Sequence, residues 1–286
     1  MPRLSPFRAL RYTPRAGDPA RLIAPPYDVI DPEAAAELRD RSPRNSVRLV
    51  LPEGEGDERY RLAADRLAEW RESGTLAADE RPGVYVYRQR YRRGDRRIER
   101  HAVFAALELE PLGEGVLPHE RTHAGPKADR LALTLATRTQ LSPVFLVSRD
   151  PEASLLEALR VSASGRPALE AATPDGISHE LWPVAEEGAA SILCALAGRN
   201  PLLIADGHHR YETALETSRR LRTEGARGVL ACVVSAADPG LTVLATHRTL
   251  TDLSDLPGAQ IGDGAPALRS GLRASFRIEE LGRLRA

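Results

Sequence analysis

The chain of 286 residues has two cysteines, a single lysine and no long apolar run, and each shortage removes a class of protein. Cys194 and Cys232 stand singly inside apolar stretches, which favours reduced core residues over a disulfide framework or a thiolate metal cluster. No segment approaches the ~20 consecutive apolar residues that span a bilayer, and no apolar signal-peptide core follows Met1. We therefore expect a cytoplasmic protein without a membrane partner.

An excess of charge is also missing, because 40 basic residues balance 40 acidic ones. Without a net basic field, non-specific binding of DNA is not expected, and small molecules are the favoured partners. Arginine supplies nearly all of the positive charge, so Lys127 is the one position that keeps a compact ammonium group. Chance and a functional requirement explain this lysine equally well.

The spacing of apolar residues predicts an α/β protein (α+β, with a mixed sheet) that is built from two units. The first unit, 1–111, combines a helix capped by Asp31, a helix over 60–70 and a hairpin that turns at 93–95. The second unit, 112–286, carries further strands and helices together with most of the candidate site residues. We expect the first unit to be an N-terminal α/β accessory unit of the second.

Short apolar segments are predicted to form strands, and the periodic segments between them are predicted to form helices. The predicted strands are 21–30 with a break at Pro25 and Pro26, 47–51, 143–147, 177–183 at a sheet edge, 201–205, and a hairpin of 229–235 with 241–246. The predicted helices of the second unit are 129–137, 151–159, 186–197 and 211–222.

The segment after residue 205 places polar groups at the end of an apolar strand and at the start of a helix. Unpaired N–H groups and a partial positive charge make such a helix start a site for anions. Gly207 permits a close backbone approach or a positive φ, while His208, His209 and Arg210 supply donors for a phosphate. Asp206 is suited to cap the helix or to hold Mg²⁺. We therefore predict a phosphate-binding turn, and the alternative is a capped helix with imidazoles at its surface.

The segment from His119 to His123 matches the H-E-x-x-H pattern of zinc metalloproteases. That chemistry needs both histidines on successive turns of one helix, with Glu120 activating a water molecule. Pro126 follows closely and biases Gly125 away from helical angles, which argues against a helix of sufficient length.

An alternative places the same segment in a loop that carries Glu120, Thr122, Lys127 and Arg130 to the turn at Gly207. Phosphoryl transfer needs cations on the phosphates and a carboxylate that accepts the proton of an attacking hydroxyl, and Glu120 supplies that carboxylate. Further candidates for the site are Tyr27 and Asp28 in the first unit, His119, and the basic pair His247 and Arg248 after the last predicted strand.

Six separated motifs occur in one order along the chain: APPYDVI at 24–30, LPHE at 117–120, PKADRL at 126–131, SP at 142–143, DGHHRYE at 206–212 and THR at 246–248. In these motifs the chain resembles the domain of unknown function 1015 family (DUF1015), and the resemblance covers nearly its whole length. Several motifs in a fixed order are far more specific than any one of them.

The LPHE and DGHHR segments also resemble those of the ParB/sulfiredoxin superfamily, which includes ParB-type CTPases, sulfiredoxins and an archaeal ADP-dependent free-serine kinase. This resemblance implies a ParB/sulfiredoxin-like nucleotide- or phosphate-binding domain over 112–286. It implies that residues 207–210 cradle nucleotide phosphates and that Glu120 matches the catalytic glutamate of the serine kinase. It also supports Asp206 as a site residue.

Together these observations predict a nucleotide-dependent phosphotransferase, a small-molecule kinase that acts on a hydroxylated metabolite such as an amino acid. Glu120 is the expected general base, Lys127 and Arg130 are expected to neutralise phosphate charge, and Mg²⁺ with ADP or ATP is the expected cofactor. Two alternatives stay open. One is a ParB-like switch module that binds and hydrolyses a nucleotide, and the other is a zinc metallohydrolase built on His119, Glu120 and His123.

Overall fold

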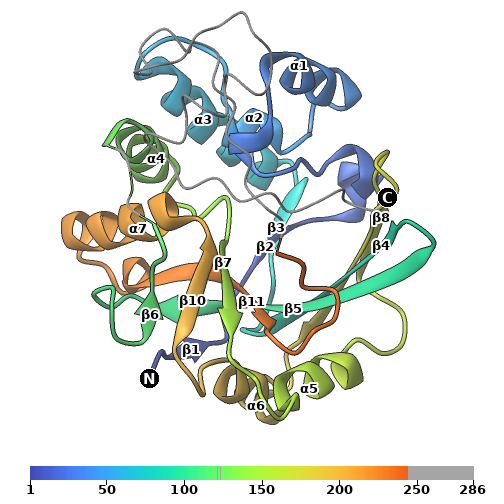
Figure 1. The fold of residues 1–286 in the computed structure, drawn as a ribbon. Helices are drawn as coiled ribbons and strands as arrows, with labels where there is room; N and C mark the ends of the chain where they lie inside the picture. Colours follow the sequence, from blue (N-terminus) through green and yellow to red (C-terminus); the bar gives the residue numbers. More distant parts are fainter. Residues whose placement is uncertain (121, 123, 244–286) are drawn as a thin grey trace, which may run out of the picture. The chain divides into compact units, whose positions relative to one another are not determined.

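The computed structural model describes residues 1–120, 122 and 124–243, and residues 1–242 form one compact unit. The unit has a mixed α/β fold, as the sequence predicted, and contains a nine-stranded sheet (Figure 1). The strands of this sheet are β1 Leu4–Ser5, β4 Val84–Arg93, β5 Arg96–Glu108, β6 Val116–Leu117, β7 Val144–Ser148, β8 Leu169–Ala172, β9 Ser178–Val184, β10 Leu202–Asp206 and β11 Gly228–Ser235. Their order is β6-β10-β7-β11-β5-β4-β9-β8, with β1 paired to β5. A separate two-stranded sheet consists of β2 Leu10–Tyr12 and β3 Leu76–Ala78.

Seven α-helices occur in the described part of the chain: α1 Pro32–Arg41, α2 Val47–Val50, α3 Glu58–Glu72, α4 Ala124–Thr137, α5 Ser154–Ser162, α6 Glu187–Ala197 and α7 His208–Leu221. Helices α5, α6 and α7 contact the large sheet and share its main core. Helix α4 packs on α7, and α3 packs on α4 (Figure 1). Single 3-10 turns lie at Pro14–Ala16, Pro19–Arg21, Tyr27–Val29 and Glu224–Arg227. None of the helices among these residues is long and apolar enough to cross a membrane.

Both cysteines are free and buried, which confirms that they are core residues. Cys194 lies on α6 in the main core. Cys232 lies on β11, on the face of that strand that points away from the main core, in a smaller cluster with Val234. Burial raises the pKa of the Cys194 thiol to about 11 and that of Cys232 to about 12. Both thiols are therefore protonated at neutral pH and unsuited to nucleophilic chemistry.

The edge of the sheet that matters most for the site is formed by β6 and β10. These strands run parallel, with Val116 opposite Leu202 and Leu117 opposite Leu203. The carboxyl ends of parallel neighbours point to the same edge of a sheet, so the segments that follow them lie side by side. This pairing brings together residues that are almost 90 positions apart in the sequence.

Several local predictions are confirmed because short-range interactions determine them. The Asp31 side chain accepts the N–H of Ala34 at 2.8 Å and caps α1, with Pro32 as the first helical residue. The expected helix over 60–70 is the central part of α3, and the hairpin that turns at 93–95 is β4 with β5.

Two strand predictions in the N-terminal region are wrong. Residues 47–51, predicted as a strand, contain the short helix α2, because Asn45 accepts the N–H of Val47 and donates to the carbonyls of Arg21 and Ile23. These bonds hold the turn that starts α2, and tertiary burial overrides the strand preference of its valines. Residues 21–30 form no strand: Arg21 ends one 3-10 turn, and Tyr27–Val29 form another.

Residues 177–183 were predicted to form a strand at the edge of the sheet. The strand exists, but its position at an edge is wrong, because β9 is internal and pairs with both β4 and β8. Strand β8, which the sequence pattern did not predict, covers it. The predicted strand 241–246 lies mostly outside the described residues. Strands from both predicted units contribute to one sheet, and the division at residue 111 stays a prediction.

Tyr211 fixes α7 to the loop after β5 and offers a test of this packing. Its side chain is fully buried, and its hydroxyl donates to the Glu110 carbonyl at 2.9 Å and accepts the Glu110 N–H at 3.2 Å. We expect Tyr211→Phe to lower the free energy of unfolding by ~1–3 kcal/mol, because both backbone groups lose this partner. Urea denaturation measures the change. The control Tyr91→Phe removes a half-buried bond to Gly240 and should cost less; an equal cost would contradict the anchoring role.

Candidate functional site

Helix α7 begins directly after β10, at a turn that only glycine accommodates well. Gly207 has a φ of 94°, and a Cβ at this position would lie 3.1 Å from the guanidinium carbon of Arg210. Among the described residues, no side chain caps the start of α7. The first N–H groups of α7 and the positive end of its dipole therefore favour an anion at this turn.

Asp206 ends β10 and pairs with Arg210, which lies one helical turn further on. The same guanidinium donates to the carbonyl of Pro143, so Arg210 links the turn to the start of β7. Of the two roles considered for Asp206, helix capping is not observed, because Arg210 takes up its carboxylate. A role in Mg²⁺ binding stays a prediction.

Glu120 and His119 meet the turn because of the parallel pairing of β6 and β10. The backbone N–H of His119 donates to Nε2 of His208 at 3.2 Å, and Nδ1 of His208 lies 3.1 Å from Oε1 of Glu120. The rings of His119 and His208 form an edge contact with centroids 4.5 Å apart. The glutamate predicted as a base thus lies next to the predicted phosphate-binding turn.

The protonation state of His208 follows from these contacts. Because Nε2 accepts a hydrogen bond, we infer that the neutral ring carries its proton on Nδ1, toward the Glu120 carboxylate. Burial lowers the pKa of His208 and outweighs the opposing effect of Glu120. A neutral imidazole donates to Glu120 without giving up its proton, so the carboxylate stays free to act as a base.

Lys127 and Thr122 both contact Glu212 in the second turn of α7. The Lys127 ammonium and the Thr122 hydroxyl each donate to Oε2 of Glu212 at 2.8 Å. Burial opposes ionisation of Glu212, but these two donors outweigh it and hold its pKa below the usual value. Lys127 therefore joins α4 to α7 beside the turn. Whether it also binds a phosphate, as the sequence suggested, stays a prediction.

Arg130 is buried and held by several partners. Its guanidinium donates to the Val50 carbonyl at 2.8 Å, pairs with Asp129, and lies 4.2 Å from the ring centre of Tyr27. Arg59 and the Tyr60 hydroxyl also bind Asp129, each at 2.8 Å. Burial raises the pKa of Tyr27, against the opposing effect of Arg130, so its hydroxyl is a donor at neutral pH.

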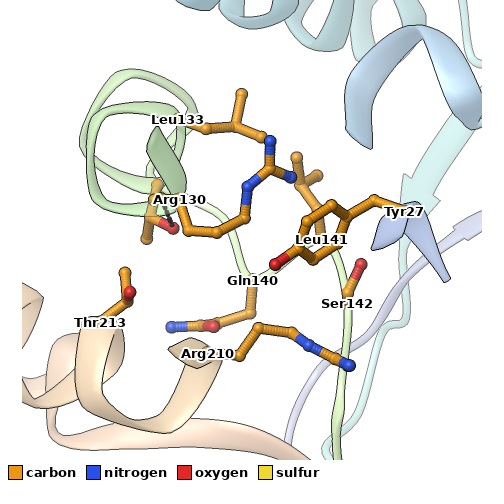
Figure 2. A pocket seen from close by; sticks show the side chains of 9 residues that line it. Tyr27, Arg130, Leu133, Gln140, Leu141, Ser142, Arg210 and Thr213 are labelled. Atoms are coloured by element: carbon orange, nitrogen blue, oxygen red, sulfur yellow. Dashed lines mark hydrogen bonds between the residues drawn. The ribbon is translucent and has the colours of Figure 1, made fainter. Parts of the chain in front are cut away.

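A pocket joins the N-terminal region to the start of α7, and Figure 2 shows its lining side chains. Tyr27 lies between the side chains of Arg130 and Arg210 in this view. The lining residues are Tyr27, Arg130, Leu133, Thr134, Gln140, Leu141, Ser142, Arg210 and Thr213. Two guanidinium groups and several neutral hydrogen-bonding groups thus surround one small hollow.

The positions of the remaining predicted site residues say little about their roles. His209 is half-buried in the first turn of α7, and Asp28 is exposed beside Tyr27. His123, His247 and Arg248 lie outside the described residues. His119 and Glu120 precede α4 and are not helical, and the described residues contain no group of three potential metal ligands.

Four residues that the sequence did not single out belong to the site. Glu212 and Ser142 stood inside quoted motifs but were not assigned, while Gln140 and Thr213 carry no recognisable pattern. Thr213 is 5 % exposed, and its hydroxyl has no hydrogen-bond partner among the described residues. Only the helical spacing of Thr213 from Arg210 could have suggested that both face one pocket.

The Asp129 cluster predicts a pH-dependent contribution to stability. Burial opposes ionisation of Asp129, but bonds from Arg130 and Tyr60 outweigh it and lower its pKa. Its contribution is therefore complete above the ordinary carboxyl value of ~3.9 and disappears as pH falls through the lower folded value.

We expect Asp129→Asn to lower the free energy of unfolding by ~2 kcal/mol at pH 7, with the difference from wild type shrinking below pH ~4. Urea denaturation at several pH values measures it. Asp40→Asn, at an exposed position on α1, is the matched control and should change little. A difference that is constant down to pH ~3 would show that the ionised carboxylate is not the stabilising species.

The fold and the site define a mixed α/β protein whose polar site surrounds the start of a helix at the edge of its sheet. The family described as "Protein of unknown function (DUF1015)" matches residues 4–266, and the chain belongs to this family. No curated protein and no solved structure matches the chain.

Proposed function

We propose that the protein is a nucleotide-dependent phosphotransferase that transfers a phosphoryl group to a hydroxyl of a small metabolite. The observation that supports it best is the position of Glu120, 3.1 Å from His208 and thus beside the turn at Gly207. The proposed anion site at Gly207 and a candidate base from a distant part of the chain are neighbours, which supports a role in phosphoryl transfer. The ParB/sulfiredoxin-like character of the domain is part of this proposal.

The nucleotide phosphates would bind at the start of α7. The N–H groups after Gly207 stabilise the phosphate charge, and the imidazole of His209 and the guanidinium of Arg210 lie in the same turn. Mg²⁺ carried by the nucleotide needs few protein ligands, since phosphate oxygens and water supply the others. Asp206, whose side chain is 48 % exposed, is the carboxylate that adjoins the turn.

Glu120 would accept the proton of the acceptor hydroxyl. The hydroxyl oxygen then forms a bond to the terminal phosphorus, and the bond from that phosphorus to the bridging oxygen breaks and releases the shortened nucleotide. His208 orients the carboxylate through its Nδ1 proton, and the Glu120 side chain remains 52 % exposed and accessible to an acceptor. The positive end of α7 stabilises the charge that develops on the transferred group.

The role of Glu120 predicts a separation of binding from turnover. A thermal-shift screen with ADP, ATP, CTP and pyrophosphate first identifies the nucleotide, because a ligand of the folded state raises Tm. We expect Glu120→Gln to keep this shift and to lose at least ~100-fold in turnover with small alcohols and amino acids, since general-base catalysis contributes about that factor. Phosphorus NMR detects the product.

Glu114→Gln is the matched control, because Glu114 is exposed in the segment before β6. It should keep both binding and turnover. Full turnover in Glu120→Gln would contradict the base role, and nucleotide hydrolysis that no acceptor stimulates would favour a hydrolysing switch over a kinase.

A further inference from the structure

Residues 91–98, at the end of the hairpin of β4 and β5, form a two-stranded ribbon that extends past the neighbouring strands (Figure 1). Strand β9 accompanies β4 only as far as Arg90, and β11 accompanies β5 only as far as Ala102. The base of the ribbon is held in place, because the Tyr91 hydroxyl donates to the Gly240 carbonyl at 2.8 Å. Residues 92–97 are all exposed, so both faces of its end are open to a partner.

Four arginines at the end of the ribbon stand in opposed pairs. Arg92 lies directly opposite Arg97, and Arg93 lies directly opposite Arg96. Within the described part of the chain none of the four forms an ion pair, and their one hydrogen bond is a 3.5 Å contact from Arg93 to the Thr242 hydroxyl. Like charges at directly opposed positions destabilise a pair of strands. This arrangement therefore costs stability unless an anion binds to it.

The acidic side chains near the ribbon do not neutralise this charge. Glu99 and Glu180 are already in ion pairs with the arginines at positions 88 and 90, at the base of the hairpin. Asp175, in the turn before β9, accepts hydrogen bonds within its own turn, and Asp95 lies in the turn of the ribbon itself. Even when both aspartates are counted, four guanidinium groups outnumber the carboxylates that no arginine pairs with among the described residues.

We propose that the ribbon binds the phosphate backbone of duplex DNA by entering its major groove. The balance of charge over the whole chain predicted no DNA partner, but that balance does not describe the local excess at the end of the hairpin. The proposal goes beyond the phosphotransferase and does not depend on it.

The geometry of the ribbon favours a groove over a flat or single-stranded partner. Directly opposed residues share a face of a strand pair, and successive residues alternate between faces. Arg92 and Arg97 therefore lie on one face of the ribbon, and Arg93 and Arg96 lie on the other. The major groove of B-DNA is about 12 Å wide, admits a two-stranded ribbon and has a phosphate backbone along each side. Each arginine pair can then bind one backbone, and guanidinium groups suit phosphate oxygens.

The test measures binding of the whole protein to a fluorescein-labelled DNA duplex of about two helical turns by fluorescence anisotropy, between ~50 and ~200 mM salt. One ribbon variant combines Arg92→Gln with Arg97→Gln, and the other combines Arg93→Gln with Arg96→Gln. Each removes one pair of opposed like charges, so both should be at least as stable as the wild type in a thermal melt.

The matched control combines Arg71→Gln with Arg166→Gln, which changes the charge by the same amount. Both residues are exposed, and neither forms an ion pair within the described residues. This variant should bind DNA as the wild type does. Turnover of the proposed phosphotransferase should be the same in all variants, so failure of that proposal leaves this one standing.

We expect the logarithm of the binding constant to fall with the logarithm of salt concentration with a slope of about −3.5, since each neutralised phosphate contributes about −0.9. Each ribbon variant should weaken binding and make the slope shallower by about 2. Absence of binding at ~50 mM salt, or ribbon variants that bind like the control, would overturn the proposal. Equally tight binding of single-stranded DNA or duplex RNA would contradict entry into a major groove. Equally tight binding of poly-L-glutamate would replace DNA with an acidic polypeptide as the partner.

Discussion

The parallel pairing of β6 with β10 is the constraint on which the rest of the site depends. It covers only two residues of β6, yet it sets the register of the segments that follow both strands. His119 then reaches the Ala205 carbonyl and His208, and Glu120 comes to lie beside the first turn of α7. A slip of one residue would turn every following side chain to the other face of the sheet.

The side chains around the turn are held by contacts within the protein. His208 is buried and neutral against Glu120, Lys127 joins α4 to Glu212 on α7, and Arg210 bridges Asp206 and the start of β7. Helix α7 is itself anchored through Tyr211 to the loop after β5. In the proposed phosphotransferase, groups that are fixed in this way would need little reorganisation when charge develops on the transferred phosphate.

The sequence predicted the features that local chemistry determines. The cap at Asp31, the hairpin of β4 and β5, and the strand, glycine and helix around residue 207 each depend on interactions within a few residues. Residues 47–51 were wrongly predicted because their helical turn depends on the buried Asn45, whose amide also binds the distant carbonyls of Arg21 and Ile23. Strand β9 was misplaced at an edge because β8 has too little apolar character to be recognised.

In the candidate site, too, the sequence predicted the local features but not the contacts that depend on tertiary packing. The turn at Gly207 and the residues after β6 were recognisable from motif and spacing, but their contact depends on sheet order, which no local pattern encodes. The pocket could not be predicted, since Tyr27, Gln140 and Thr213 come from three separate segments that tertiary packing brings together.

The central claim is that the start of α7 binds phosphate, and calorimetric titration of pyrophosphate tests it most directly. Gly207→Ala would force a side chain into a φ of 94° and against Arg210, and Gly94→Ala imposes a positive φ at a remote hairpin turn with open space around it. We predict that the wild type and Gly94→Ala bind pyrophosphate with equal affinity and that Gly207→Ala, while folded, loses at least ~tenfold. No binding to the wild type, or unchanged binding to Gly207→Ala, would contradict the claim.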